Sequence, residues 1–242
     1  MAAGDRTRTT LRWAYGFSRL AVAALLALLV ALDAGCTNSI RGPGVVAPDA
    51  PAQTTLERPS YQPHGDFLLE RIAEFEVVAA VLSAKRYRLG REARLAPVDL
   101  ALGWGPMSDQ AIVDRLSISQ FRRFYWWKAR QLPIPRRDIE RHSANMHMIP
   151  ATPEVARHLK RVRRGDVVHL SGYLVNASMD GRWRWRTSVT RDDTGSGACE
   201  LVLVEEVRVA DGPHVEVMLQ YGAYRFPEKS GRAGQSVREG PS

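Results

Sequence analysis

The stretch Gly165-Asp166-Val167-Val168-His169-Leu170-Ser171-Gly172-Tyr173-Leu174-Val175 decides the fold class, because a turn dipeptide leads directly into an apolar run. Similar runs cover residues 183–190, 199–209 and 215–219, and turn residues such as Asp180-Gly181 separate them. Turn dipeptides between apolar runs are the strongest local signal for β-hairpins. The C-terminal third is therefore predicted to form four successive antiparallel strands, as a meander or a small barrel.

One part of this pattern resembles a known architecture. Residues 165–172 resemble the opening strand of small OB-type barrels, in which a glycine such as Gly172 lets a strand bend at a barrel corner. The resemblance implies an open barrel that binds an elongated ligand.

The residues upstream of this stretch predict a mixed α and β region. A strand is expected at 74–83, although its apolar positions also fit a helix, and residues 67–72 are expected to add one or two helical turns. Further strands are expected at 121–127 and 146–149, and short helices at 108–116, 136–142 and 152–163. The fold class is thus α+β, with an antiparallel meander or small OB-like barrel in the C-terminal third and short helices.

The N-terminus predicts export. Four arginines precede an uninterrupted apolar run at residues 20–32, which as a helix would reach roughly 20 Å and fall short of the roughly 30 Å hydrocarbon core. A basic flank followed by a short apolar core is typical of a secretory signal. Ala34-Gly35-Cys36 resembles the end of bacterial lipoprotein signals, which implies lipidation of Cys36, although Asp33 replaces the leucine usual in that family. Cleavage near Ala34 without a lipid, or an uncleaved anchor, are the alternatives.

Composition places one domain behind this segment. The chain has 242 residues, a net charge of +8 and only two cysteines, too few for a disulfide framework. The predicted organisation is an export segment at 1–36, a Pro-rich flexible linker at 37–66, a single globular α+β domain at 67–227 and a disordered tail at 228–242.

Three residues are candidates for catalysis: His147 as a general base, Cys199 as a thiol nucleophile and Asn145 as an orienting group. The alternative is a buried histidine between methionines and a buried, inert thiol. His142 and His147 share neither a helical face nor a strand face, and neither HExxH nor Cys-x-x-Cys occurs. We therefore predict no metal and no cofactor.

Two other sets are candidates for ligand binding. Trp104 stands between two glycines with Asp99 and Asp109 nearby, so it either lines a ligand groove or plugs the core from a tight turn. Arg182, Arg184 and Arg186 alternate with tryptophans, so a strand would put the arginines on one face. They would then contact an anionic partner, or simply face water while the tryptophans fill the core.

These observations favour an exported, membrane-tethered envelope module that binds a polymer, a lipid or another envelope protein. It would sit on the periplasmic face of a bacterial membrane, held by a lipid or a signal anchor at its N-terminus. The alternatives are an envelope hydrolase using His147 with Cys199, and a protein that binds nucleic acid or another anionic polymer. For an exported protein, a glycan or peptidoglycan is favoured over nucleic acid as partner.

Overall fold

The computed structural model of the chain describes residues 41–189 and 199–210. The predicted export segment with Cys36, the predicted strand at 215–219 and the tail at 228–242 lie outside the described residues.

The described part is dominated by strands. The strands are β1 (Ala52–His64), β2 (Phe67–Arg86), β3 (Val98–Gly103), β4 (Ser117–Phe121), β5 (Phe124–Lys128), β6 (Ser143–Pro150), β7 (Val167–Met179), β8 (Trp183–Trp185) and β9 (Glu200–Ala210). The helices are α2 (Arg91–Leu95), the 3₁₀ turn η1 (Gly105–Ser108), α3 (Gln110–Val113), α4 (Arg136–Arg141) and α5 (Pro153–Leu159).

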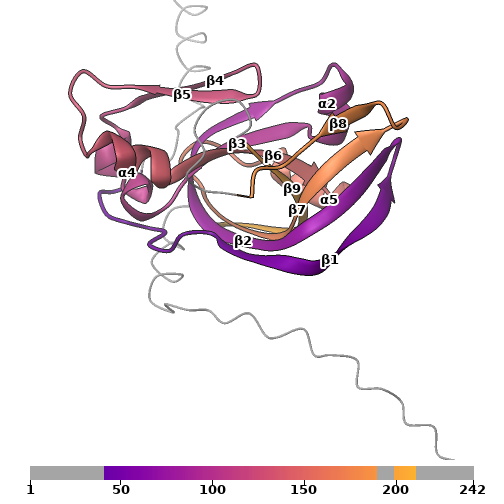
Figure 1. Cartoon of the computed structure of the whole chain (residues 1–242). Helices are drawn as coiled ribbons and strands as arrows, with labels where there is room; N and C mark the ends of the chain where they lie inside the picture. Colours follow the sequence, from indigo (N-terminus) through magenta and orange to yellow (C-terminus); the bar gives the residue numbers. More distant parts are fainter. Residues whose placement is uncertain (1–40, 190–198, 211–242) are drawn as a thin grey trace, which may run out of the picture. The chain divides into compact units, whose positions relative to one another are not determined.

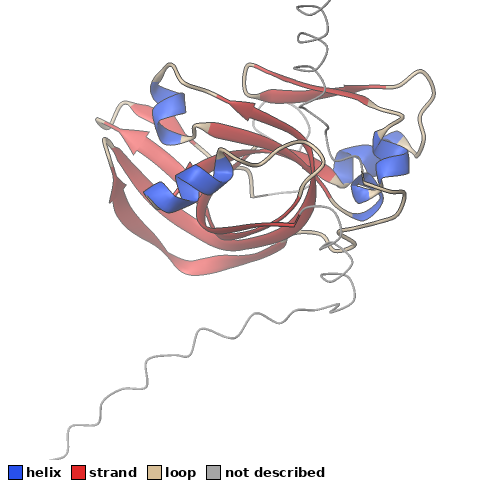
Figure 2. Cartoon of the chain, turned by 180° about the vertical axis from the view of Figure 1, so that it is seen from behind, coloured by secondary structure: helices blue, strands red, loops and turns tan. Residues whose placement is uncertain are grey.

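Five of the strands close into a barrel (Figures 1 and 2). Pairing runs from β2 to β3, β6, β9 and β7, and β7 pairs back with β2. All of these pairs are antiparallel except β6 with β9, and α5 connects β6 to β7. A five-stranded Greek-key barrel with this connectivity is OB-like. The predicted α+β class and small OB-like barrel are confirmed, but the barrel extends from residue 67 to 210 and its ring of pairings is closed.

Alternation along the strands fills the barrel. The inward side chains form one buried cluster that includes Phe75 and Val77 of β2, Leu100 of β3, Met146 of β6 and Leu170 of β7. Val155 and Leu159 of α5 belong to the same cluster. The helix starts as predicted, with Thr152 Oγ1 accepting a hydrogen bond from the Val155 N–H at 3.2 Å and Pro153 in the first turn, but it ends at Leu159.

Gly172 has a steric role in this barrel. The β7–β9 register shifts between Ser171 and Gly172, and a Cβ at Gly172 would lie 1.9 Å from the carbonyl oxygen of Leu203. Only glycine permits so close a backbone approach at a bulge. The predicted bend at this glycine is therefore consistent with the structure, although the segment forms the fourth barrel strand and not the first.

Several sequence expectations differ from the structure. The predicted linker at 37–66 contains β1, which pairs with β2 through residues 52–64. β1 is an edge strand with most side chains exposed, so it has no apolar period to detect. Residues 67–72 belong to β2 and are not helical, and the predicted strand at 121–127 is the β4–β5 hairpin. β7 lies between β8 and β9, so the last third is not a simple meander.

Candidate functional site

A buried polar cluster lies on the outer side of β3 and β6. Asp99, Asn145 and His147 alternate with core residues and so point away from the barrel interior. Their exposed fractions are nevertheless only 0%, 4% and 2%. The β4–β5 hairpin covers this face, because Gln120 of β4 donates a hydrogen bond from Nε2 to Asn145 Oδ1 at 2.6 Å. In OB barrels the corresponding strands often bind the ligand, so the chain's own hairpin covers the usual site.

Arg123, at the tip of this hairpin, is the centre of the cluster. Its Nη1 donates to Asp99 Oδ1 at 2.7 Å and to the Ala96 carbonyl at 2.8 Å. Its guanidinium lies 3.8 Å from the centre of the Tyr87 ring. Arg122 and Arg123 have φ values of 49° and 71°, a left-handed pair that normally requires glycine or asparagine in a two-residue hairpin turn. The buried ion pair and the ring contact stabilise this turn.

The structure brings the three predicted catalytic residues to this cluster. His147 Nδ1 lies 3.0 Å from Asp99 Oδ1, although the contact lacks hydrogen-bond geometry, and its ring centre is 4.7 Å from that of Trp185. Asn145 Nδ2 donates to the Arg123 carbonyl at 2.9 Å, and Cys199 Sγ lies 3.9 Å from the same oxygen. Asn145 and Cys199 therefore meet at the turn of the hairpin, whereas His147 contacts Asp99 and Trp185.

The protonation of Cys199 argues against thiol chemistry here. Burial raises the pKa of the Cys199 thiol to about 11, and the neighbouring Glu200 carboxylate adds to the rise. The reactive form of a cysteine is the thiolate, which is scarce at neutral pH with such a pKa. The cluster has the features of a structural clamp. Cys199 is half-buried, and its raised pKa favours the alternative of an inert thiol.

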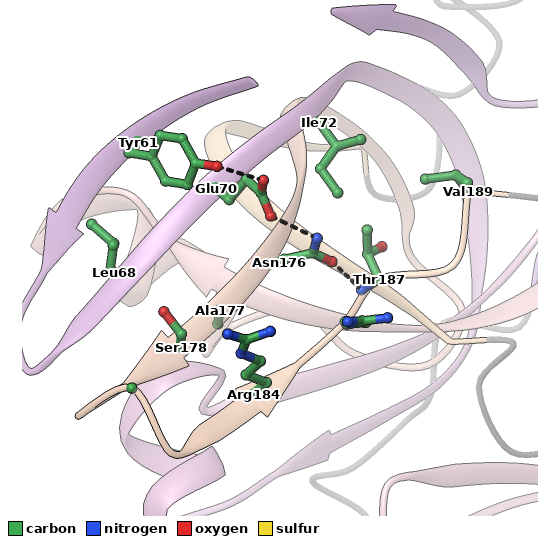
Figure 3. A pocket seen from close by; sticks show the side chains of 12 residues that line it. Tyr61, Leu68, Glu70, Ile72, Asn176, Ala177, Ser178, Arg184, Thr187 and Val189 are labelled. Atoms are coloured by element: carbon green, nitrogen blue, oxygen red, sulfur yellow. Dashed lines mark hydrogen bonds between the residues drawn. The ribbon is translucent and has the colours of Figure 1, made fainter. Parts of the chain in front are cut away.

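A separate groove opens between the β1–β2 hairpin and β8, and Figure 3 shows its lining. Its volume is about 480 Å³. A chain of hydrogen bonds crosses it: Tyr61 donates its hydroxyl to Glu70 Oε1 at 2.8 Å, and Asn176 Nδ2 donates to Glu70 Oε2 at 2.9 Å. The Thr187 N–H donates to Asn176 Oδ1 at 3.1 Å and completes the chain.

Two of the three predicted arginines line this groove. Arg184 and Arg186 are exposed, and neither guanidinium is hydrogen-bonded to another described residue. The pKa of the Glu70 carboxyl is lowered, mainly by the hydrogen bond from Asn176 and then by the hydrogen bond from Tyr61. The positive charges of Arg184 and Arg186 lower it further. Arg182 is exposed in the turn before β8 and does not line the groove. The tryptophans between the arginines pack against a buried cluster, as the alternation predicts.

The other predicted ligand residues are structural. Trp104 is 3% exposed and belongs to the main core cluster, so it plugs the core and does not line a groove. Asp109 Oδ1 accepts hydrogen bonds from the Ala111 and Gly44 N–H groups, both at 2.9 Å. It therefore caps α3, so that the helix expected at 108–116 begins only after Asp109. Ser108 Oγ instead holds the N–H groups of Val46 and Ala47.

The residues that sequence reasoning missed are non-local. Asp99 was expected only as a neighbour of Trp104 and not as the partner of Arg123, which lies 24 positions away. Tyr61, Glu70 and Asn176 meet only when β2 pairs with both β1 and β7. The alternation of arginine and tryptophan at 182–186 was the one local signal for the groove.

Residues 41–189 and 199–210 contain neither a cluster of metal-binding side chains nor a helix that could cross a membrane. No group of three or more His, Cys, Asp or Glu side chains there could hold a metal ion. None of the helices in that part is both long enough and apolar enough to span a bilayer. Comparison with protein-family models, with curated proteins and with solved structures finds no match for this chain.

Proposed function

We propose that this protein is an exported, membrane-tethered binding module of a bacterial cell envelope. We further propose that the groove between the β1–β2 hairpin and β8 is its ligand site and takes an elongated, anionic glycan. The N-terminal sequence supports the tether, and the groove supports the ligand. The proposal does not depend on catalysis.

One observation carries the ligand assignment. Glu70 is the carboxylate of the groove, and it is satisfied by the neutral donors Tyr61 and Asn176. The guanidinium groups of Arg184 and Arg186 therefore make no hydrogen bond to Glu70, and their N–H donors face the groove. Two guanidinium groups against one carboxylate leave a positive balance, and guanidinium forks match carboxylate and sulfate groups.

The position and shape of the groove agree with a polymer ligand. β8 belongs to the connection between β7 and β9, the fourth and fifth barrel strands, and this connection contributes to oligosaccharide and oligonucleotide sites in OB barrels. Tyr61 is 63% exposed at the rim, where an aromatic ring can stack on a sugar face. The alternative of a hydrolase using His147 with Cys199 is disfavoured, because both lie in the clamp and the thiol stays protonated at neutral pH.

Binding of the purified full chain to isolated peptidoglycan sacculi and to alginate tests this proposal. Arg184→Gln with Arg186→Gln should lower the affinity by about tenfold or more, since each substitution removes a charge-assisted contact. Arg182→Gln with Arg88→Gln is the matched control, because it removes the same two charges from exposed side chains outside the groove. Equal losses in both variants, or no binding by the unaltered protein, would contradict the glycan site.

The tether has its own test. Cell fractionation with intact-mass measurement of the mature protein determines whether the chain begins at Cys36 with a lipid, begins elsewhere, or retains its first methionine. A full-length chain found in the cytosol would overturn the envelope assignment and leave the groove measurement unaffected.

A further inference from the structure

The outer face of the β4–β5 hairpin is unusually aromatic. Phe121, Phe124 and Trp126 project from it, with exposed fractions of 63%, 37% and 57%. Phe121 pairs with Phe124 across the strands, and Trp126 pairs with Ser119, so all three lie on one face. The opposite face, with Tyr125 and Trp127, packs against a buried cluster. Exposed aromatic residues gathered on one face mark an interaction surface.

The charged residues of the hairpin and of the segments next to it in sequence are basic, although Asp114 lies near Lys128 and Arg130 at its base. Residues 115–137 contain seven arginines and lysines and no aspartate or glutamate. Arg123 is buried against Asp99 and Arg136 pairs with Glu140, while Arg122, Lys128 and Arg130 are exposed. Aromatic rings bordered by cations are complementary to a bilayer with anionic headgroups, because the rings enter the interfacial zone and the cations stay at the phosphates.

The hairpin presents this face in a preformed arrangement. Arg123 anchors the tip through Asp99 and Ala96, and Gln120 anchors the end of β4 next to the tip through Asn145. Docking therefore does not require the hairpin to become ordered, which removes part of the entropic cost of binding.

The path of the chain favours a bilayer as the occupant. Val46 packs against the same cluster as Tyr125 and Trp127, and Ser108 Oγ accepts hydrogen bonds from the Val46 and Ala47 N–H groups at 3.1 Å. The chain that comes from the predicted tether thus joins the buried cluster that also supports the inner face of the hairpin. A bilayer held at the N-terminus would lie within reach of this face.

We infer that the outer face of the β4–β5 hairpin is a membrane-docking surface for a bilayer containing anionic lipid. This inference builds on the proposed tether but assigns a second membrane contact within the domain. The tether and the hairpin would together fix which side of the barrel faces away from the membrane. Single-stranded nucleic acid, which also selects aromatic and basic faces, is the competing occupant that the test must distinguish.

The experiment uses the full chain with Leu25→Asp and Leu29→Asp, which break the N-terminal apolar run so that it cannot insert. This doubly substituted protein is the parent for the other variants. It should sediment with vesicles of phosphatidylethanolamine and phosphatidylglycerol, and added salt should weaken its binding to them. Phe121→Ser with Trp126→Ser should weaken it by about tenfold or more, since two interfacial rings are lost. Leu89→Ser with Val209→Ser is the matched control, because it removes two apolar side chains that are 91% and 42% exposed away from the hairpin, and it should bind as the parent does.

Circular dichroism melting confirms that each variant is folded. Failure of the parent to bind the anionic vesicles, equal binding by the Phe121/Trp126 variant, or an equal loss in the Leu89/Val209 variant would overturn the inference. Tighter binding to oligothymidine than to vesicles, lost in the same variant, would assign the face to nucleic acid instead. Failure of the tether is seen separately, as release of the unaltered chain from cell membranes by high salt, which weakens the docking contact but does not release an anchor.

Discussion

Replacement of Asp99 by asparagine tests whether the buried ion pair holds the hairpin on the barrel. The substitution keeps the shape of the side chain and leaves the Arg123 guanidinium without its carboxylate. The two side chains are 12% and 0% exposed, and Nη1 and Oδ1 are 2.7 Å apart. Removal of one partner from a buried pair costs roughly 3–5 kcal/mol. Arg123 keeps its hydrogen bond to the Ala96 carbonyl and its contact with Tyr87, so we expect a loss of about 3 kcal/mol, at the lower end of that range.

Urea unfolding followed by circular dichroism measures this loss. For a chain of this size it corresponds to a fall in Tm of about 6–12 °C. Glu140→Gln is the control, since it removes the exposed pair with Arg136 and should change the free energy of unfolding by less than about 0.5 kcal/mol. Hydrogen exchange should also accelerate in β4 and β5 before it does in β7. A loss below about 1 kcal/mol for Asp99→Asn, or one no larger than that of the control, would refute the clamp.

Cys199, Tyr125 and Gly172 give further predictions. Because burial raises the pKa of the Cys199 thiol to about 11, alkylation at Cys199 in the folded protein at pH 8, followed by peptide mass mapping, should be about two hundredfold slower than for a free thiol. The folded pKa lies above the unfolded value, so the contribution of Cys199 to stability is complete below pH 9 and is lost as the pH rises from 9 through 11; an unchanged stability over that range contradicts the burial. Burial also raises the pKa of Tyr125 to about 12. Spectrophotometric titration of the Tyr125→Phe variant should therefore lack one phenol that ionises near that pH in the unaltered protein. If the missing phenol is instead one that ionises in the ordinary range, Tyr125 is exposed. Gly172→Ala should lower the free energy of unfolding by about 2–4 kcal/mol through its clash with the Leu203 carbonyl, whereas Gly42→Ala, with open space around it, should change it by less than about 0.5 kcal/mol.

The sequence predicted the elements whose signals are local. Asp180 and Gly181 both have left-handed φ values, 52° and 66°, which agrees with the hairpin turn that this dipeptide predicts between β7 and β8. Thr152 and Pro153 marked the start of α5 for equally local reasons. The apolar alternation of β2 identified its central residues, and the ambiguity with a helix disappears once pairing with β3 and β7 is known.

The elements that sequence reasoning missed depend on partners far along the chain. β1 has no apolar face, and it is a strand because the first half of β2 offers it a free edge. The β4–β5 turn uses Arg122-Arg123 where the usual signal is Asn-Gly, and its conformation is supported by Asp99 and Tyr87, neither of which is adjacent in sequence. The groove requires Glu70 and Asn176 to meet across 106 positions.

The β4–β5 hairpin explains why the two proposed contacts fall where they do. Gln120 and Arg123 on its inner side cover Asp99, Asn145 and His147, so the barrel face that OB proteins often use for ligands is filled by the chain itself. The ligand site that we propose is therefore elsewhere, in the groove beside β8, where Arg184 and Arg186 are exposed. The strand alternation that turns Tyr125 and Trp127 inward also turns Phe124 and Trp126 outward. One hairpin thus closes one surface and creates another. Loosening it with Asp99→Asn should weaken vesicle binding more than glycan binding at the proposed groove, which the hairpin reaches indirectly, through Trp185.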